Sequence, residues 1–257
     1  MRVSTVYGPV DSWRVGRSLG VDLLCVQSVC SFRCAYCQLG RIDVHTAGRR
    51  VFVPTERVLE DLEASDWRGA DAVTLSGSGE PTLAANLGEV VGGIKRRTGK
   101  PVVVLTNSAH LRDARVRREL SRADAVFCKL DAADEETFRR VNRPVEGVTL
   151  RNVFEGIRRL RSEYAGRLCV QLMLLPSNKG RAAEFADLLR CLRPEEVQIN
   201  SPSRAVPRTW TPEARGNHSP DEREGVMLKT VSQAEAGDFA DYLRRAAGLN
   251  VVSRESR

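Results

Sequence analysis

The sequence predicts an α/β fold built as a partial (β/α)6 barrel, with an irregular proline-rich loop and a C-terminal helix added to it. Short apolar runs typical of buried strands alternate with segments of helical periodicity, six times in succession. Alternation of this kind produces βαβ units and a parallel sheet, and six repeats suggest a barrel that is open at one side. The chain has 257 residues, a length that suits one such domain or two smaller ones.

Each repeat pairs an apolar strand with a helix. The predicted strands are Gly20–Cys25, Ala72–Ser76, Pro101–Thr106, Ala125–Leu130, Leu168–Leu174 and Val197–Asn200. The predicted helices are 55–67, Ala84–Thr98, Asp113–Ser121, Asp134–Val141, Thr149–Tyr164 and Ala182–Cys191. Thr55 suits the N-cap of the first helix because its hydroxyl can accept a hydrogen bond from an unpaired backbone amide. A last helix, Gln233–Ala247, precedes a short extended tail around Val251 and Val252.

One segment, 201–224, interrupts this alternation. It contains Pro202, Pro207, Pro212 and Pro220 among many charged residues, which predicts a long irregular loop after the sixth strand. Loops of this length are usually functional or disordered, so a substrate lid and a mobile connector are both open. We expect a core domain over residues 1–204 and an extension over residues 205–257 that packs on it.

Composition narrows the class of protein. No apolar run approaches the roughly 20 residues that cross a bilayer, and the first residues lack the apolar stretch of a signal peptide. We expect a cytoplasmic protein without a membrane partner, in which the seven cysteines stay reduced. The net charge of +7 permits a nucleic-acid partner, although solvated helix faces account for most of the arginine pairs.

Three cysteines near the N-terminus, Cys30, Cys34 and Cys37, have the spacing C-x-x-x-C-x-x-C. Iron–sulfur cubes ordinarily take four cysteine ligands, so three would leave one iron open to bind another molecule. An open position is typical of a catalytic metal site, whereas a structural site is closed. A zinc site with a fourth ligand elsewhere, and a thiol redox pair with a bystander, are the alternatives.

Polar residues recur on one face of several predicted strands. Residues two apart in a strand face the same side, which groups Lys129 with Asp131 and Gln198 with Asn200. Further polar strand residues are Thr74, Ser76, Thr106 and Gln171. We expect these side chains to line the barrel interior near its C-terminal mouth, where barrel enzymes place their chemistry. The alternative is that each one satisfies backbone groups at a strand end.

A glycine-rich segment follows the second strand and consists of Gly77, Ser78, Gly79 and Glu80. Its two glycines let the backbone approach a ligand closely and expose amide groups. Glu80 adds a carboxylate at the carboxyl end of the strand, where it can pair with an ammonium group. The segment is therefore a candidate binding loop beside the cysteines.

These two motifs, one βα unit apart, resemble those of the radical S-adenosylmethionine (SAM) superfamily. Further segments, among them 129–132 and 142–144, resemble a subgroup of Fe–S oxidoreductase type that is related to the wyosine-tRNA synthesis proteins. The resemblance extends over about residues 5–204. One departure is that residues 1–24 contain none of the cysteines with which wyosine-forming enzymes hold a second cluster.

The resemblance implies roles for individual residues. Cys30, Cys34 and Cys37 would hold a [4Fe–4S] cluster whose fourth iron binds the amino and carboxylate groups of SAM. Tyr36 would lie near the adenine. The remaining cofactor contacts would come from Gly77, Ser78, Gly79, Glu80, Thr106, Asn107 and Asn200. Lys129 and Asp131 would serve catalysis at the substrate pocket, although Lys129 could instead simply pair with Asp131.

The reaction implied by the resemblance is the reductive cleavage of SAM to a 5′-deoxyadenosyl radical, which abstracts hydrogen from a small molecule, a peptide or a tRNA. A reductant such as flavodoxin or ferredoxin would supply the electron. A tRNA-modifying enzyme of the wyosine-synthesis type is the first alternative. A non-catalytic Fe–S or zinc protein that uses the same cysteines is the second.

Overall fold

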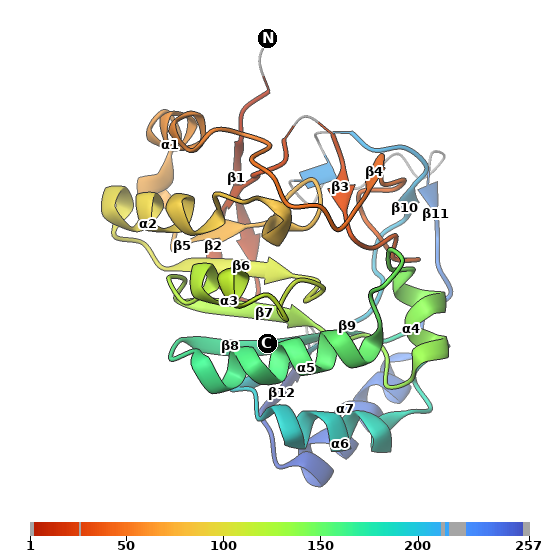
Figure 1. The fold of residues 1–257 in the computed structure, drawn as a ribbon. Coiled ribbons are helices and arrows are strands. Elements are labelled where there is room, and N and C mark those ends of the chain that lie inside the picture. Colours follow the sequence, from red (N-terminus) through yellow and green to blue (C-terminus); the bar gives the residue numbers. More distant parts are fainter. Residues whose placement is uncertain (1–2, 26, 212–213, 216–224, 254–257) are drawn as a thin grey trace.

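An eight-stranded sheet carries the fold (Figure 1), with its strands in the order β1, β2, β5, β6, β7, β8, β9 and β12. Neighbouring strands run parallel, except that β1 and β2 form an antiparallel hairpin. The computed structural model describes residues 3–25, 27–211, 214–215 and 225–253. The strands of the sheet are β1 (Val6–Ser12), β2 (Gly16–Val21), β5 (Ala72–Leu75), β6 (Val102–Thr106), β7 (Ala125–Lys129), β8 (Arg167–Met173), β9 (Glu196–Asn200) and β12 (Val251–Ser253). The short pairs are β3 (Val29–Cys30) with β4 (Val44–His45), and β10 (Val206–Pro207) with β11 (Gly225–Val226).

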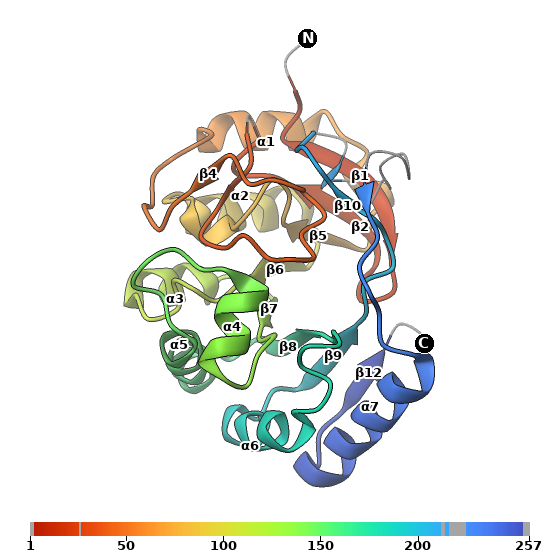
Figure 2. The same ribbon diagram turned by 90° about the vertical axis from the view of Figure 1, so that its right-hand side faces the viewer.

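Helices cover the outer face of the curved sheet (Figures 1 and 2). They are α1 (Thr55–Glu63), α2 (Leu87–Thr98), α3 (Ala114–Leu120), α4 (Glu135–Asn142), α5 (Leu150–Glu163), α6 (Ala182–Leu192) and α7 (Gln233–Ala247). Two helix ends follow sequence rules: the Thr149 side chain accepts the Asn152 amide hydrogen to cap α5, and Gly99 ends α2 with a left-handed φ of 63°. The predicted N-cap at Thr55 is wrong, because Thr55 is the first residue of α1, Pro54 precedes it at the cap position, and no side chain caps this helix. None of the described helices is long and apolar enough to cross a membrane.

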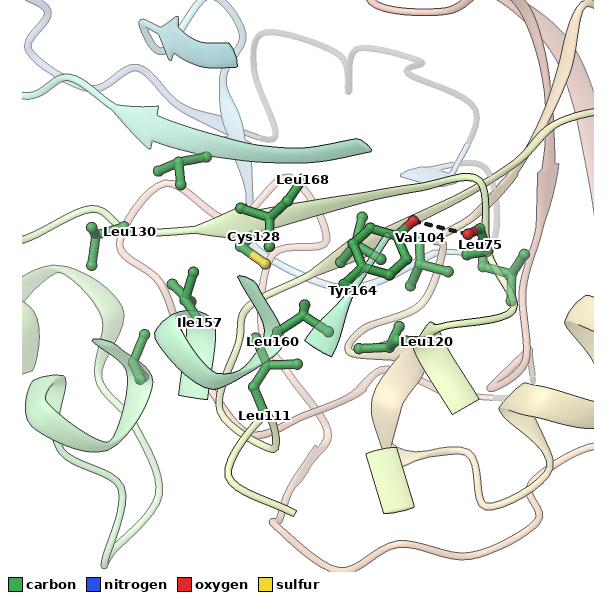
Figure 3. Packing of buried hydrophobic residues seen from close by; sticks show 14 of the residues in the cluster. Leu75, Val104, Leu111, Leu120, Cys128, Leu130, Ile157, Leu160, Tyr164 and Leu168 are labelled. Carbon is green, nitrogen blue, oxygen red and sulfur yellow. Dashed lines mark hydrogen bonds between the residues drawn. The ribbon is translucent and has the colours of Figure 1, made fainter. Parts of the chain in front are cut away.

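The main core lies between the sheet and these helices (Figure 3). Val104 of β6, Leu120 of α3 and Leu160 of α5 belong to one continuous buried cluster. Burial of each such side chain contributes about 1.5–3 kcal/mol. Tyr164 joins the cluster without an unpaired polar group, because its hydroxyl donates to the Ala123 carbonyl at 2.9 Å. Much of the apolar packing thus lies on the helix side of the strands.

The predicted partial barrel is confirmed: all six predicted strands and all seven predicted helices form. Within the described ranges the edge strands β1 and β12 are not paired with each other, so the sheet is an open arc. The predicted bounds Gly20–Cys25 are wrong, because β2 ends at Val21 and the Asp22 carboxylate then accepts the amide hydrogens of Leu24 and Cys25. Strand β1, and the pairing of the C-terminal tail with β9, were not expected from the pattern.

The segment between β9 and α7 passes close to the cysteine loop. A Cβ atom at Gly40 would come within 2.6 Å of the Pro207 carbonyl oxygen, and Gln38 donates a hydrogen bond to the Arg204 carbonyl at 3.4 Å. The predicted proline-rich loop lies partly outside the described residues, which leave out Pro212 and Pro220. Farther on, α7 packs against α6 and β12 extends the sheet beside β9. The expected extension therefore shares the sheet of the core, and a domain boundary near residue 204 stays a prediction.

Candidate active site

The three cysteines lie on one loop that begins at the end of β3. Cys30 is the last residue of that strand, and a turn further on is closed by a 3.1 Å hydrogen bond from the Cys37 amide to the Cys34 carbonyl. The amide of Ala35 donates to the carbonyl of Val141, at the end of α4, at 2.8 Å. These contacts fix the loop against the segment that follows β7, at the carboxyl end of the sheet, where the strand pattern predicts the chemistry.

Burial is the main cause that raises the pKa of each of these thiols. The pKa of Cys34 rises to about 12, with the neighbouring Cys37 and Asp131 adding to the effect of burial. For Cys30 the carboxylate of Glu80 is the second cause of the raised pKa, after burial. Burial likewise raises the pKa of Cys37. Crowded thiols of raised pKa become thiolates when a metal compensates their charge, so metal binding at this loop would release protons.

The donor set fits an iron–sulfur cluster. Two N–H groups point at Cys30 Sγ, the Phe32 amide at 3.4 Å and Asn107 Nδ2 at 3.5 Å, and Asn142 Nδ2 points at Cys34 Sγ at 3.6 Å. Donors of this kind tune clusters that are held by cysteine thiolates. No three Cys, His, Asp or Glu side chains of the described residues are placed to hold a single metal ion. A cubane binds each thiolate through a different iron, so its ligands need not gather around one point.

The glycine-rich segment lies directly against the strand that carries the first cysteine. The Val29 amide donates to the Ser78 carbonyl at 2.8 Å, and the Glu80 amide donates to the Val29 carbonyl at 3.0 Å. At Gly79, φ is 149° and a Cβ atom would lie 1.7 Å from the Val29 carbonyl oxygen. Only glycine fits there. The sequence predicts a close backbone approach to a ligand at this segment, whereas the close approach at Gly79 is to the cysteine strand.

Asp22 anchors the other end of this segment. Its carboxylate accepts hydrogen bonds from the amide of Ser78 at 3.1 Å and from its hydroxyl at 2.6 Å. Gly77, with φ 134°, makes room for it, since a Cβ atom there would lie 2.5 Å from Asp22 Cγ. Arg215, from the segment after β9, reaches the same carboxylate at 3.3 Å with 7% of its side chain exposed. The glycine-rich segment is thus tied to the end of β2 and, through Asp22, to the C-terminal extension.

Glu80 is buried and joins the ends of β5 and β6. One carboxylate oxygen accepts from the Thr82 amide (3.1 Å), the Thr82 hydroxyl (2.6 Å) and the Thr106 hydroxyl (2.7 Å). The other accepts from the Asn107 amide at 2.6 Å. A carboxylate offers about four lone-pair sites, so these donors use most of its capacity. Thr106 and Asn107 thus lie beside Glu80, as expected for residues that share one cofactor site. The contacts of these three residues with SAM stay predictions.

Asp131 is a fully buried junction between four segments of the site. One oxygen accepts from the Met173 amide at 2.8 Å and pairs with Lys129 Nζ at 3.0 Å. The other accepts from the Tyr36 hydroxyl and from Asn142 Nδ2, the latter at 2.8 Å. Lys129 Nζ also lies 5.1 Å from the centre of the Tyr36 ring. These contacts favour the reading in which Lys129 pairs with Asp131, and they make Asp131 a group that positions its neighbours.

The inner face of the sheet carries polar side chains, as the strand alternation predicts. Gln171 donates to Gln198 at 2.8 Å. Arg14, in the turn between β1 and β2, donates to Gln198 at 3.1 Å and to Asn200 at 2.9 Å, so this turn reaches across the open side of the barrel (Figure 2). Sequence reasoning missed Arg14, since its partners lie 184 and 186 positions away in the chain and no local pattern marks it.

A cleft of about 1200 Å³ connects the cysteine loop with this polar interior. Cys34, Tyr36 and Cys37 line one part of it, and Trp13 and Asn200 line another. One face of α7, from Gln233 to Arg244, forms part of the remaining wall. Pockets for a single small ligand usually measure about 300–1,000 Å³, so this cleft has room for a cofactor and a substrate together.

Comparison with known proteins identifies relatives at the level of sequence. Residues 24–189 match the family model of the radical SAM superfamily. A UPF0026 protein of Synechocystis sp. is 43% identical over 251 residues, which cover 96% of this chain and 94% of that protein. The likeness to that protein therefore extends beyond the residues that the superfamily model matches.

Solved structures agree in fold. The structure of Streptococcus suis SuiB bound to S-adenosylmethionine has a TM-score of 0.64 at 14% identity, covering 89% of this chain and 48% of that one. Archaeal TYW1 has a TM-score of 0.58 at 15% identity, covering 93% of this chain and 76% of that one. Enzymes of the superfamily use a [4Fe–4S] cluster together with SAM. The match over most of the chain's length, with the cysteine loop at the carboxyl end of an open α/β barrel, shows that this chain belongs to the radical SAM superfamily of enzymes.

Proposed function

We propose that this enzyme cleaves SAM reductively at the loop of Cys30, Cys34 and Cys37 and acts on a substrate held in the adjoining cleft. One observation carries the proposal: the cleft is lined by Cys34, Tyr36 and Cys37 themselves and extends to Arg14 and to Asn200 at the end of β9. When bound at this loop, the cluster and SAM supply a 5′-deoxyadenosyl radical, and the protein orients the reactants and excludes water.

The residues around the loop are suited to hold the two ends of SAM. The glycine-rich segment is fixed on both sides, by Val29 and by Asp22, so its backbone is preorganised for the methionyl end. Tyr36 borders the cleft with its hydroxyl held by Asp131, which leaves its ring to lie against the adenine. Asn200, oriented by Arg14, faces the same cleft farther from the cysteines.

The cleft favours a polar substrate. Its walls combine the charged and hydroxyl side chains of the β1–β2 turn and of residues 200–204 with those at the start of α7. Polar side chains that line a cleft orient a ligand through hydrogen bonds, which favours a substrate that carries polar groups. A small molecule and a peptide both meet this description.

The reductant is proposed to dock beside the cysteine loop. Arg33 and Arg41 of the loop are exposed, and so is Arg143, whose carbonyl accepts the Arg33 amide hydrogen at 3.1 Å. Positive charge at the rim of the site speeds the encounter with an acidic electron carrier such as flavodoxin or ferredoxin.

A tRNA substrate is the second candidate, because the same exposed arginines could meet phosphates. When a protein neutralises several phosphates, the logarithm of its binding constant falls linearly with the logarithm of the salt concentration. Titration of tRNA into the reconstituted enzyme at several salt concentrations tests this candidate. The absence of salt-dependent binding argues against it and leaves the small-molecule and peptide classes.

The central proposal is tested by anaerobic reconstitution with iron and sulfide, followed by dithionite and SAM. We expect 5′-deoxyadenosine and methionine to form in the wild-type protein. Cys34→Ala should form neither 5′-deoxyadenosine nor methionine. The matched control is Cys191→Ala, at an exposed position on α6, which should behave as wild type. A wild-type protein that holds its cluster and still releases neither product would contradict the proposal.

A further inference from the structure

We propose that Asn107 and Asn142 raise the reduction potential of the cluster by donating amide hydrogens to two of its cysteine sulfurs. The inference rests on the proposed function to the extent that Cys30 and Cys34 are the ligands. Neither asparagine belongs to the cysteine loop, since Asn107 follows β6 and Asn142 is the last residue of α4. Each reaches a different sulfur from a different side.

The orientation of the Asn107 side chain is fixed by its own contacts. Its Nδ2 lies 3.5 Å from Cys30 Sγ and donates to the Ser31 hydroxyl at 2.9 Å. Its Oδ1 accepts the Ala109 amide hydrogen at 3.0 Å. Because a backbone amide can only donate, the oxygen must face Ala109, and the NH₂ group must face the cysteine.

The same reasoning fixes Asn142. Its Nδ2 donates to the Asp131 carboxylate at 2.8 Å and lies 3.6 Å from Cys34 Sγ. A carboxylate only accepts, so the NH₂ group faces both Asp131 and the sulfur. The residue is 2% exposed, so water does not compete for these hydrogens from the bulk.

Asn142 carries these contacts at a cost to stability. Its Oδ1 is buried and has no hydrogen-bond partner among the described residues. A buried polar atom left unpaired destabilises a fold, and an apolar side chain of similar volume would remove that cost. The amide group is therefore explained by what its N–H groups reach, which is Asp131 and the sulfur of Cys34.

The sign of the effect follows from electrostatics. Reduction adds negative charge to a cluster and its sulfurs, and an N–H donor stabilises that charge more strongly in the low dielectric of a buried site. Hydrogen bonds to cluster sulfurs are among the features that set the potential. Both asparagines should therefore favour the reduced state and make the cluster accessible to a weaker reductant.

The test is a potentiometric titration of the reconstituted protein, followed by electron paramagnetic resonance, with iron content measured in parallel. Asn107→Leu and Asn142→Leu keep the volume and remove the donor. We expect each to lower the one-electron equilibrium constant about tenfold, equivalent to about 59 mV. Asn152→Leu, on α5 away from the cysteine loop, is the matched control and should leave the potential unchanged. If Asn142→Leu assembles no cluster, Asn142→Ser, whose hydroxyl is too short to reach the sulfur, replaces it.

The outcomes separate this inference from the proposed function. More negative potentials at both positions, with full iron content and an unchanged control, support it. Unchanged potentials in Asn107→Leu and in the cluster-bearing Asn142 variant overturn the inference and leave the proposed function standing. If the wild-type protein assembles no cluster at all, both fall.

Discussion

Asp131→Ala is expected to lower the free energy of unfolding by roughly 3–5 kcal/mol, the usual cost of removing one partner from a buried ion pair. The Lys129 side chain is 18% exposed and that of Asp131 is 0% exposed, so the ammonium loses its counter-charge in a largely buried place. The Met173 amide and Asn142 Nδ2 also lose their acceptor. Each unpaired donor costs about 1–3 kcal/mol where water cannot replace the carboxylate, and the separate costs do not simply add.

The ion pair can be separated from the other contacts by a double-mutant cycle with Lys129→Met. The double variant removes the unpaired charge, so it should recover about 2–3 kcal/mol relative to Asp131→Ala alone. Urea unfolding of the iron-free protein, followed by circular dichroism, measures all four species without a contribution from the cluster. The exposed pair of Glu155 and Arg158 on α5 is the control and should show no resolvable coupling. If Asp131→Ala lowers the free energy of unfolding by less than about 1 kcal/mol, the carboxylate does not hold these segments together. If the effects of Asp131→Ala and Lys129→Met are additive, the ion pair between the two side chains contributes nothing to stability.

Three further predictions follow from single contacts. Gly79→Ala would place a methyl group 1.7 Å from the Val29 carbonyl oxygen and should displace β3, so the iron content after reconstitution should fall severalfold. Full iron content would show that the glycine-rich segment and β3 are not packed this tightly. Thr149→Ala removes the N-cap of α5 and should lower the free energy of unfolding by about 1 kcal/mol in a denaturant titration, with iron content unchanged; no loss of stability would mean that the cap contributes little. Arg33→Glu should slow reduction by a flavodoxin several-fold at low ionic strength and much less at high salt in stopped-flow traces, and equal rates at low salt would exclude Arg33 from the docking surface.

The sheet and the cysteine loop could be predicted from the sequence because both depend on local patterns. Alternation along β7 places Lys129 and Asp131 on one face, and the two side chains do pair. Apolar runs mark every parallel strand from β5 to β9, since those strands are buried between helices and the barrel interior. The exception is β2, whose end is set by the side chain of Asp22 rather than by hydrophobicity.

Contacts between distant segments could not be predicted in this way. Arg14 reaches β9 only because the β1–β2 hairpin folds across the open side, and its own neighbourhood in sequence gives no hint of that path. Asn142 lies in a segment that carries the family resemblance, yet its role depends on α4 ending beside Cys34. The pairing of β12 with β9 likewise follows from the packing of α7, since a three-residue apolar tail is too short to identify as a sheet strand.

The two carboxylates that the sequence singles out have parallel positions in the site, and this parallel suggests how the site is organised. Glu80 accepts the backbone amide of Asn107, whose side chain donates to Cys30, and Asp131 accepts the side chain of Asn142, which donates to Cys34. Each acid is buried, and each lies just beyond the carboxyl end of a strand, β5 or β7. A buried carboxylate costs free energy unless donors surround it, so the donors are held as firmly as the acid itself. Each acid therefore holds an asparagine whose side-chain N–H group points at a cysteine sulfur, and this arrangement accounts for the burial of both carboxylates within the site.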